Sequence, residues 1–354
     1  MIQELLSARR LPLLWSGAAD PADPAAWEAN RPALLNRLAE CCYGKACDVP
    51  CEVQAKQLDC DPQALGGQAT EYRVLLTLRS AEGKSTSLPL TLLLPPANRP
   101  VPVFLWPRFQ SSLDTGFYPA EEILDAGYGL AVCYYQDIAL DSAQTDAGLF
   151  ETTERYTWGK IAKWAFGLSR IMDYLETVPD IDAGRIALLG ESRLGKTVLW
   201  TAANDRRFSL VIPAFSGTGG VSLYRGNEKE TLKRLLANFP YWFCADFAAR
   251  TGSADNLFFD SHTLIALCAP KRFYTCMGES DPFVDYHNEF LACCAASPAY
   301  RLYEMEGLSA PDRWPAVSRP LQDGAIGFHV RPGGHFLCRY DWQQLMGYRN
   351  RYHL

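Results

Sequence analysis

The segment Arg185–Thr197, with the sequence RIALLGESRLGKT, carries two patterns that predict different chemistries. The stretch from Gly190 to Thr197 matches G-x-x-x-x-G-K-[ST], the loop whose backbone N–H groups hold phosphates at a helix N-terminus. Proteins that use this loop also need an acid at the end of a neighbouring strand to hold magnesium. The next apolar strand, 210–215, ends without an acid, which disfavours a nucleotide site.

The same turn also fits a nucleophile elbow. The sequence Gly190-Glu191-Ser192 places Ser192 at the tip of a strand-to-helix turn, where a hydroxyl is exposed and helical N–H groups can stabilise an oxyanion. The second glycine of the usual G-x-S-x-G pattern is displaced by one position, to Gly195, so the match by pattern alone is weaker. The alternative is that Ser192 only caps the helix and carries no chemistry.

Partner residues for Ser192 occur in the chain order serine, acid, histidine that this kind of hydrolase uses. Asp281 follows the apolar strand 273–277, and His335 lies in a glycine-rich stretch near the C-terminus. A serine hydroxyl needs a base to remove its proton, and the base needs a carboxylate to hold its tautomer. The three residues together predict nucleophilic catalysis.

The assignment of the base rests on elimination among five histidines. His353 lies at the frayed terminus, and His287 fits a solvated helix start. His262 lies in a helix that precedes the acid, and His329 fits a strand. His335 is therefore the predicted base. Asp281 is the favoured acid, and Asp285 and Glu279 remain alternatives.

Strands alternate with helices along most of the chain. The expected strands cover 72–79, 87–94, 102–106, 128–135, 185–189, 210–214, 273–277 and 300–303. The expected helices cover 121–126, 158–177, 193–204 and 257–267. The alternation predicts an α/β fold with a mostly parallel sheet covered on both faces and an antiparallel N-terminal edge. We expect a helical extension at 1–65 that packs on a catalytic domain at 66–354.

Composition and charge exclude several classes of protein. The 354 residues are 48% hydrophobic and 21% charged, which is typical of a globular chain and not of a disordered one. A net charge of −6 disfavours binding to nucleic acid or to an anionic membrane. The apolar runs are shorter than the roughly 18–20 residues of a spanning helix. No signal peptide is recognisable, so we expect a cytoplasmic location.

The twelve cysteines do not form the pattern of a disulfide framework. Most are expected to be small buried side chains in a reducing compartment. A cluster near the start of the chain comprises Cys41, Cys42, Cys47, Cys51 and Cys60. It could bind zinc, but it lacks C-x2-C pairs and a nearby histidine. We therefore predict no metal and no other cofactor.

Several motifs together resemble the glucuronoyl esterases, carbohydrate esterase family 15. Besides GESRLGK at 190–196, they are YPAEEILDAGYG at 118–129, WAFGLSR at 164–170, FSGTGG at 215–220, NFPYWFC at 238–244, DSH at 260–262 and GFHVRPGGH at 327–335. The resemblance implies an α/β-hydrolase fold with a three-layer sandwich. It also implies a metal-independent serine esterase that cleaves the ester between 4-O-methylglucuronic acid on xylan and lignin alcohols.

The resemblance also implies roles for individual residues. Arg193 would help to form the oxyanion hole, and Lys196 would contact sugar hydroxyls. Phe283, Trp242 and Asp260 are further candidates for substrate binding. The alternatives are a structural ion pair for Arg193, a solvated position for Lys196, and core packing for the aromatic side chains.

Three departures from the family pattern affect the predicted site. Phe215 stands where many members carry the triad glutamate, and a phenyl ring cannot orient an imidazole, so the acid must be Asp281 after the later strand. Phe283 replaces a tryptophan that lines the sugar site, which keeps a stacking face but loses an N–H donor. The loop 106–112 replaces a Gly/Asn-rich loop.

The leading hypothesis is a serine esterase that acts on a small-molecule or oligosaccharide ester, most simply a glucuronoyl ester. The alternatives are an acetyl-carbohydrate esterase of the same fold, a nucleotide-binding protein, and a catalytically inactive carbohydrate-binding homologue. Neither nucleic acid nor a membrane is an expected partner, and the sequence does not indicate an oligomeric state.

Overall fold

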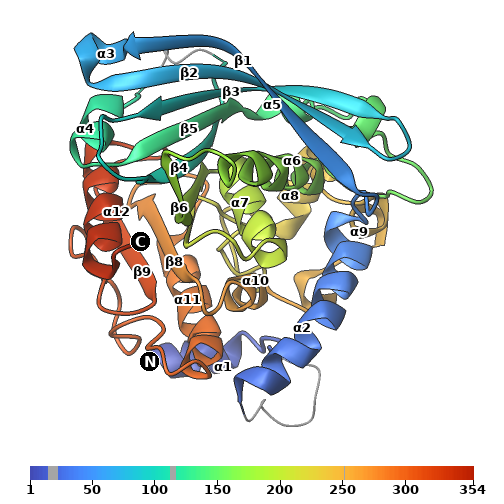
Figure 1. Ribbon diagram of the computed structural model, residues 1–354. Helices are drawn as coiled ribbons and strands as arrows, with labels where there is room; N and C mark the ends of the chain where they lie inside the picture. Colours follow the sequence, from blue (N-terminus) through green and yellow to red (C-terminus); the bar gives the residue numbers. More distant parts are fainter. Residues whose placement is uncertain (15–22, 112–116, 251) are drawn as a thin grey trace.

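A nine-stranded mixed sheet organises the structure, a computed structural model that describes every residue except 15–22, 112–116 and 251 (Figure 1). Its strands lie in the order β1-β2-β3-β5-β4-β6-β7-β8-β9. They are β1 (Cys51–Gln63), β2 (Ala69–Ser80), β3 (Ser85–Leu94), β4 (Val101–Arg108), β5 (Gly129–Tyr134), β6 (Ile181–Glu191), β7 (Leu210–Ala214), β8 (Arg272–Gly278) and β9 (Ile326–Arg331).

The pairing of the strands confirms the predicted architecture. The first strands pair antiparallel, β1 with β2, β2 with β3, and β3 with β5. From β5 to β9 every pair is parallel. The parallel strands are buried along almost their whole length, as expected where helices cover both faces.

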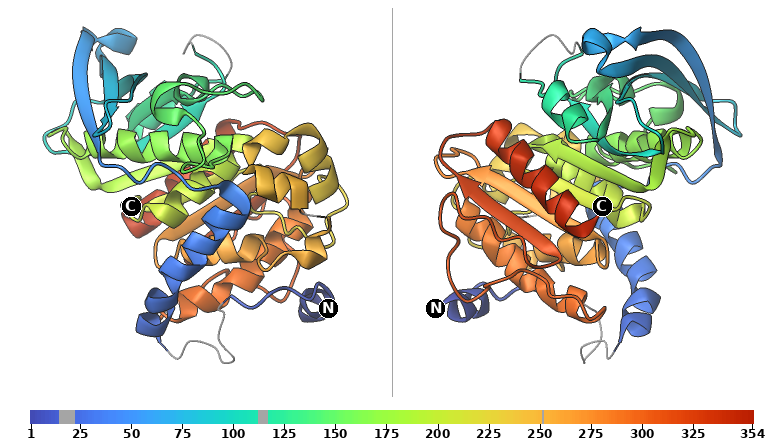
Figure 2. Two further views of the ribbon diagram at one scale, coloured as in Figure 1. Left: turned by 90° about the vertical axis from the view of Figure 1, so that its right-hand side faces the viewer. Right: turned by 60° about the vertical axis from the view of Figure 1, so that its left-hand side comes forward.

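Helices flank the parallel part of the sheet on both sides, with α12 on one face and α7, α10 and α11 on the other (Figure 2). The helices are α1 (Ile2–Ala8), α2 (Pro24–Leu38), α3 (Ala64–Gly67), α4 (Ala120–Asp125), α5 (Tyr135–Ile138), α6 (Lys160–Leu175), α7 (Arg193–Asn204), α8 (Leu232–Asn238), α9 (Ala245–Arg250), α10 (Ser261–Leu267), α11 (Tyr286–Arg301) and α12 (Arg339–Tyr352). None of the helices in the described residues is long and apolar enough to span a membrane.

The N-terminal region departs from the prediction in part. Two helices, α1 and α2, occupy its start, and the guanidinium of Arg31 in α2 donates to the Leu267 carbonyl at 3.2 Å, which ties α2 to the core. Residues 51–63, however, form strand β1, so a helical extension over 1–65 is wrong for this stretch. Most side chains of β1 are exposed and show no buried face, so backbone pairing with β2 defines the strand.

Two other segments differ from the expectation. Residues 300–303, expected as a strand, lie at the end of α11 and in the turn that follows. Of the loop expected at 106–112, residues 106–108 belong to β4 and residue 112 lies outside the described residues. Short apolar runs do not distinguish a buried helix turn from a strand by periodicity alone.

The sheet brings the predicted chemical residues to one edge. Ser192 follows β6, Asp281 follows β8, and His335 follows β9. Because these strands are parallel, their carboxyl ends lie at the same edge, and Ser192 and His335, which are 143 positions apart in the chain, can meet there.

A buried carboxyl group, Glu289 in α11, joins β8 to the segment after β7. The N–H of Gly217 and the hydroxyl of Ser222 donate to its Oε1 at 3.0 and 3.2 Å. The Thr275 hydroxyl lies 3.1 Å from Oε2 and 3.0 Å from the Pro213 carbonyl, so its single proton is shared between these two acceptors. Burial outweighs these hydrogen bonds and raises the pKa of Glu289 to about 8, so the carboxyl is mostly protonated at neutral pH.

This group makes stability depend on pH. The folded state keeps the Glu289 proton up to about pH 8, whereas the unfolded chain releases it near the ordinary value of 4.5. The contribution of this group is fully present below that value and is lost as pH rises toward 8. We expect Glu289→Gln, which keeps a donor and an acceptor without titrating, to flatten the decline in the free energy of unfolding over this window.

Urea unfolding between about pH 5 and about pH 8 measures this effect. Glu306→Gln, at an exposed position, is the matched control and should keep the wild-type slope. An unchanged slope in Glu289→Gln would contradict the assignment of a protonated carboxyl.

Candidate active site

Ser192 occupies a strained turn between β6 and α7. Its φ of +57° and ψ of −126° lie outside the regions that side-chain-bearing residues favour. The Ser192 N–H donates to the Ala214 carbonyl of β7 at 3.0 Å, which fixes the turn to the neighbouring strand. A strained residue that its surroundings hold in place is typical of a functional position.

Two glycines make room for this turn. A Cβ atom on Gly190 would lie 2.3 Å from the Leu194 carbonyl oxygen. A Cβ atom on Gly195 would lie 2.8 Å from Ser216 Cβ and 2.9 Å from the Ala214 carbonyl oxygen. The displaced glycine of the elbow pattern therefore allows α7 to approach the segment after β7 closely.

His335 and Asp281 form a hydrogen-bonded pair. His335 Nδ1 lies 2.7 Å from Asp281 Oδ2. The N–H groups of Phe283 and Val284 donate to Asp281 Oδ1 at 2.8 and 3.0 Å. Burial alone would raise the pKa of Asp281, which is 1% exposed, but these hydrogen bonds outweigh it and hold the pKa below its ordinary value. The carboxylate is therefore kept ionised against the imidazole.

The two alternative acids lie elsewhere. Asp285 caps α11 by accepting from the His287 N–H at 3.0 Å. Glu279 is exposed, and its backbone N–H donates to the Arg331 carbonyl at 2.8 Å. Of the three candidates left open by the sequence, Asp281 is the one that contacts His335.

Ser192 and His335 line one pocket of about 300 Å³, together with Phe109, Glu191, Arg193, Phe215 and Phe336. The ring of Phe215 meets the edge of the His335 ring with 5.7 Å between centroids. Phe283 packs against His335 at 5.3 Å and is 57% exposed, so it can meet a ligand at the mouth. The imidazole is thus held between two aromatic rings.

Arg193 is held by a carboxylate that sequence reasoning missed. Its guanidinium forms an ion pair with Asp141 and lies 5.0 Å from the centre of the Trp242 ring. Asp141 also accepts from Trp242 Nε1 and from the Tyr135 hydroxyl, each at 2.8 Å. Arg193 Nε is buried and has no hydrogen-bond partner within the described chain. Asp141 precedes Arg193 by 52 residues, and no local motif marks it.

The other predicted substrate-binding residues are placed differently. Trp242 is buried behind Arg193, stacked on Phe239 at 4.0 Å, and supports the arginine without lining the pocket described above. Lys196 is 3% exposed, and its ammonium donates to the Ser216 carbonyl at 2.6 Å and to Glu230 at 2.9 Å. A lysine bound in this way is not free to hold a phosphate, which removes the main support for a nucleotide site.

Asp260 serves the fold. It caps α10 through the Ser261 N–H at 2.8 Å and accepts from the Tyr224 N–H at 2.7 Å and from Arg225 Nη1 at 3.1 Å. The carboxylate is completely buried, and both oxygens are engaged. The expectation that Asp260 binds substrate is therefore corrected to a structural role.

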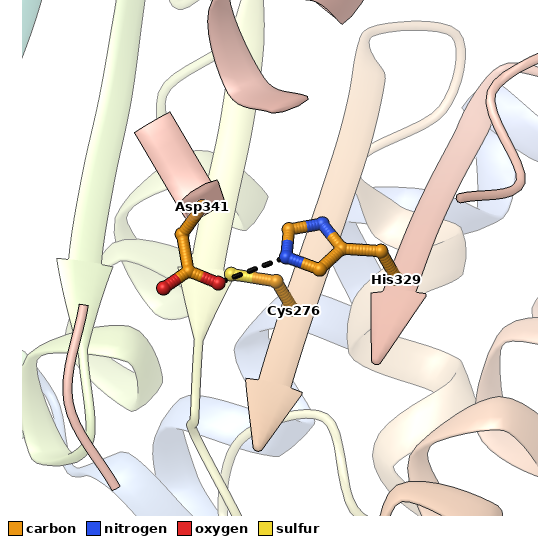
Figure 3. A group of neighbouring side chains, drawn as sticks. All are labelled: Cys276, His329 and Asp341. Carbon is orange, nitrogen blue, oxygen red and sulfur yellow. Dashed lines mark hydrogen bonds and ion pairs between the residues drawn. The ribbon is translucent and has the colours of Figure 1, made fainter. Parts of the chain in front are cut away.

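Cys276, His329 and Asp341 lie close enough to one another to hold a metal ion (Figure 3). His329 Nε2 lies 2.9 Å from Asp341, and its Nδ1 lies 2.9 Å from the Tyr274 hydroxyl. Arg331 Nε donates to both oxygens of Asp341, at 3.0 and 2.8 Å. A guanidinium on the carboxylate and two occupied ring nitrogens do not suit a cation, so this group is a hydrogen-bond network.

This network supports the loop that carries His335. The Arg331 guanidinium also donates to the carbonyls of Pro332 and Phe336, on either side of His335. His329 is the satisfied strand histidine that the sequence predicts, since both its nitrogens have partners. The early cysteine cluster is not among the groups of the described residues that could share an ion.

Comparison with known proteins agrees with this geometry. The family model described as "Glucuronyl esterase, fungi" matches residues 78–307, well over half of the chain. A protein named Carbohydrate esterase MZ0003, from an unknown prokaryotic organism, is 42% identical over 235 residues, which cover 64% of this chain and 54% of that protein. The 4-O-methyl-glucuronoyl methylesterase of Hypocrea jecorina is 34% identical over 126 residues, 33% of this chain and 27% of that protein.

The matched segments thus span about half or less of these curated relatives. Solved structures match over nearly full length. A glucuronoyl esterase from Solibacter usitatus has a TM-score of 0.85 at 31% identity, covering 96% of this chain and 97% of that one. A promiscuous CE15 esterase from a marine bacterial metagenome has a TM-score of 0.86 at 33% identity, with 96% of each chain covered. The fold is that of the α/β-hydrolases, and the chain belongs to the glucuronoyl esterase family.

Proposed function

We propose that the chain is a serine esterase that hydrolyses a 4-O-methylglucuronoyl ester. The observation that carries this proposal is the 2.7 Å contact between His335 and Asp281, with the strained Ser192 in the same pocket. The activity named for its relatives supports the substrate class. A pocket of about 300 Å³ is at the lower end of the range for small-molecule sites and suits one sugar ring.

The proposed reaction proceeds in two halves. Ser192 Oγ attacks the ester carbonyl carbon, its proton passes to His335, and the carbonyl electron pair moves onto the oxygen beside Arg193. When the carbonyl reforms, the alcohol leaves with the proton from His335, and the uronoyl group remains on Ser192. Water then attacks this acyl group in the same way, which releases the uronic acid and restores the Ser192 hydroxyl.

We also propose a cytoplasmic location. All twelve cysteines, every one of which lies in the described residues, are free thiols. Exposed Cys41 and Cys60 would oxidise readily in an oxidising compartment, so the composition favours a reducing one.

The triad assignment predicts a steep loss when the acid is neutralised. Asp281→Asn keeps the shape of the side chain but lets the amide donate to His335, which favours the wrong tautomer. We expect kcat on methyl 4-O-methylglucuronate to fall by roughly 10⁴-fold, as when the orienting acid of other serine hydrolases is lost. Ser192→Ala should abolish both turnover and labelling by a fluorophosphonate.

Glu279→Gln is the control, because it removes an exposed acid from the same loop, and it should keep near-full activity. Full activity of Asp281→Asn would refute the acid assignment. Absence of wild-type turnover on the glucuronate ester, with Ser192 still labelled, would refute the substrate and leave the serine chemistry standing.

Arg193 is expected to act on the transition state. Arg193→Ala removes a donor beside the developing oxyanion, so kcat should fall by about 10²–10³-fold with little change in KM. Asp141→Asn keeps partners for Trp242 and Tyr135 but removes the ion pair, and a smaller loss of kcat should follow. A rise in KM alone in Arg193→Ala would instead assign this residue to ground-state binding.

Lys196 distinguishes a sugar contact from a structural role. If the Lys196 ammonium contacts sugar hydroxyls, Lys196→Met should raise KM for glucuronate esters and leave the kinetics on a simple aryl acetate unchanged. Because the ammonium is bound to Ser216 and Glu230, we expect comparable losses on both substrates and a lower Tm. A selective rise in KM with an unchanged Tm would restore the sugar contact.

A further inference from the structure

Lys229 lies in the segment between β7 and α8, and its ammonium binds the loop that carries Asp281. The ammonium donates to the backbone carbonyls of Asp281 and Val284 at 2.7 and 2.9 Å. The side chain is partly exposed and takes no part in the proposed reaction. Its two hydrogen bonds therefore join the segment after β7 to the loop after β8, where the triad acid lies.

The turn Asp281–Val284 is fixed by two groups. The N–H groups of Phe283 and Val284 donate to Asp281 Oδ1, at 2.8 and 3.0 Å. The carbonyls at the two ends of the turn, those of Asp281 and Val284, accept from the Lys229 ammonium, which has three donors and can bind both at once. The other carboxylate oxygen, Oδ2, is left to contact His335 Nδ1 at 2.7 Å. The position of this carboxylate thus depends on a turn that Lys229 closes.

Lys229 is itself held by side chains of its own segment. Its N–H donates to Asn227 Oδ1 at 3.0 Å, and Nδ2 of the buried Asn227 donates to the Thr218 hydroxyl oxygen at 2.7 Å. Thr218 is bound in turn to Glu230, since its N–H donates to Glu230 Oε2 at 2.9 Å and its hydroxyl donates to the Glu230 carbonyl. Because the residues on both sides of Lys229 are anchored, its ammonium holds the acid loop from a fixed place.

The same segment also holds the helix of the nucleophile. Glu230 Oε2 accepts from the Lys196 ammonium at 2.9 Å, and Lys196 lies in α7, four residues after Ser192. The adjacent residues Lys229 and Glu230 therefore bind different elements, one the acid loop and the other α7. Since a misplacement of about 1 Å among reacting groups can lower a rate by about 10²-fold, a segment that fixes both elements affects catalysis.

We propose that Lys229 is a positioning residue that keeps the Asp281 carboxylate against His335 by binding the two carbonyls of the acid loop. The proposal rests on the proposed esterase function. Asp281 orients the imidazole and stabilises its positive form only while the 2.7 Å contact is kept. Without the ammonium, two hydrogen bonds between the loop and the segment after β7 are lost, and the carboxylate samples positions away from the imidazole.

Two variants of Lys229 test this role. Lys229→Met removes the ammonium and keeps a side chain of similar length. The kcat on methyl 4-O-methylglucuronate should fall by roughly 10- to 100-fold with little change in KM, because Asp281 contacts the base and not the substrate. In Lys229→Arg the guanidinium still offers donors to both carbonyls, so the loss should be smaller. Lys233→Met removes an exposed ammonium from the same part of the chain and, as the matched control, should keep the wild-type rate.

A double-mutant cycle with Asp281→Asn tests whether Lys229 acts through the acid. The readout is the second-order rate of Ser192 labelling by a fluorophosphonate in the wild type, the two single variants and the double variant. Once the carboxylate is neutralised, its position matters little, so Lys229→Met should lower the labelling rate of Asp281→Asn by less than about twofold. A residue that only stabilised the fold would lower the rate by the same factor in both backgrounds.

Labelling depends on the serine and its base and needs no sugar, so the cycle tests Lys229 even if the substrate is a different ester. A wild type that is not labelled would overturn the serine mechanism and this inference with it. A wild-type labelling rate in Lys229→Met, equal losses in Lys229→Met and Lys229→Arg, or the same factor in both backgrounds of the cycle would overturn the role of Lys229 and leave the triad standing.

Discussion

The hydrogen bond between His335 Nδ1 and Asp281 Oδ2 constrains how the chain leaves β8 and β9. Beyond the paired strands, the Glu279 N–H donates to the Arg331 carbonyl and the Ser280 N–H donates to the Gly333 carbonyl at 3.0 Å. A Cβ on Gly278 would lie 2.2 Å from the Gly333 carbonyl oxygen, so only glycine permits this approach. The hydrogen-bonded pairing thus continues into the loops and brings Asp281 and His335 into contact.

Because the carboxylate that contacts His335 follows β8, the end of β7 can carry an apolar side chain. Phe215 packs on the His335 ring, and its backbone N–H donates to the Cys276 carbonyl at 2.9 Å. The segment that follows is held through Gly217 by the buried carboxyl of Glu289. The Phe215 ring excludes water from the side of the imidazole that it covers, which strengthens the interaction of the imidazole with Asp281.

The candidate triad could be predicted from the sequence because its residues lie in local motifs. Ser192 and His335 follow from turn chemistry and chain order, and the loss of an acid at Phe215 pointed to Asp281. Asp141 could not be found in this way, because its contact with Arg193 joins distant segments. The partners of Lys196 and Asp260 could not be predicted from the sequence, since burial and the groups that satisfy a charged side chain are properties of the fold. In the same way β1 has no buried face to mark it and exists through pairing with β2.

The charges around the pocket follow a common arrangement. Arg193 is paired with Asp141, and His335 is paired with Asp281. A charge buried without a partner is strongly unfavourable, so these pairs allow charged groups to stand in a partly apolar pocket before any substrate enters. The proposed reaction would add two transient charges, a cation on His335 and an anion on the substrate oxygen. Each forms next to groups already oriented toward it, so little of the surrounding structure has to reorganise during the chemical step.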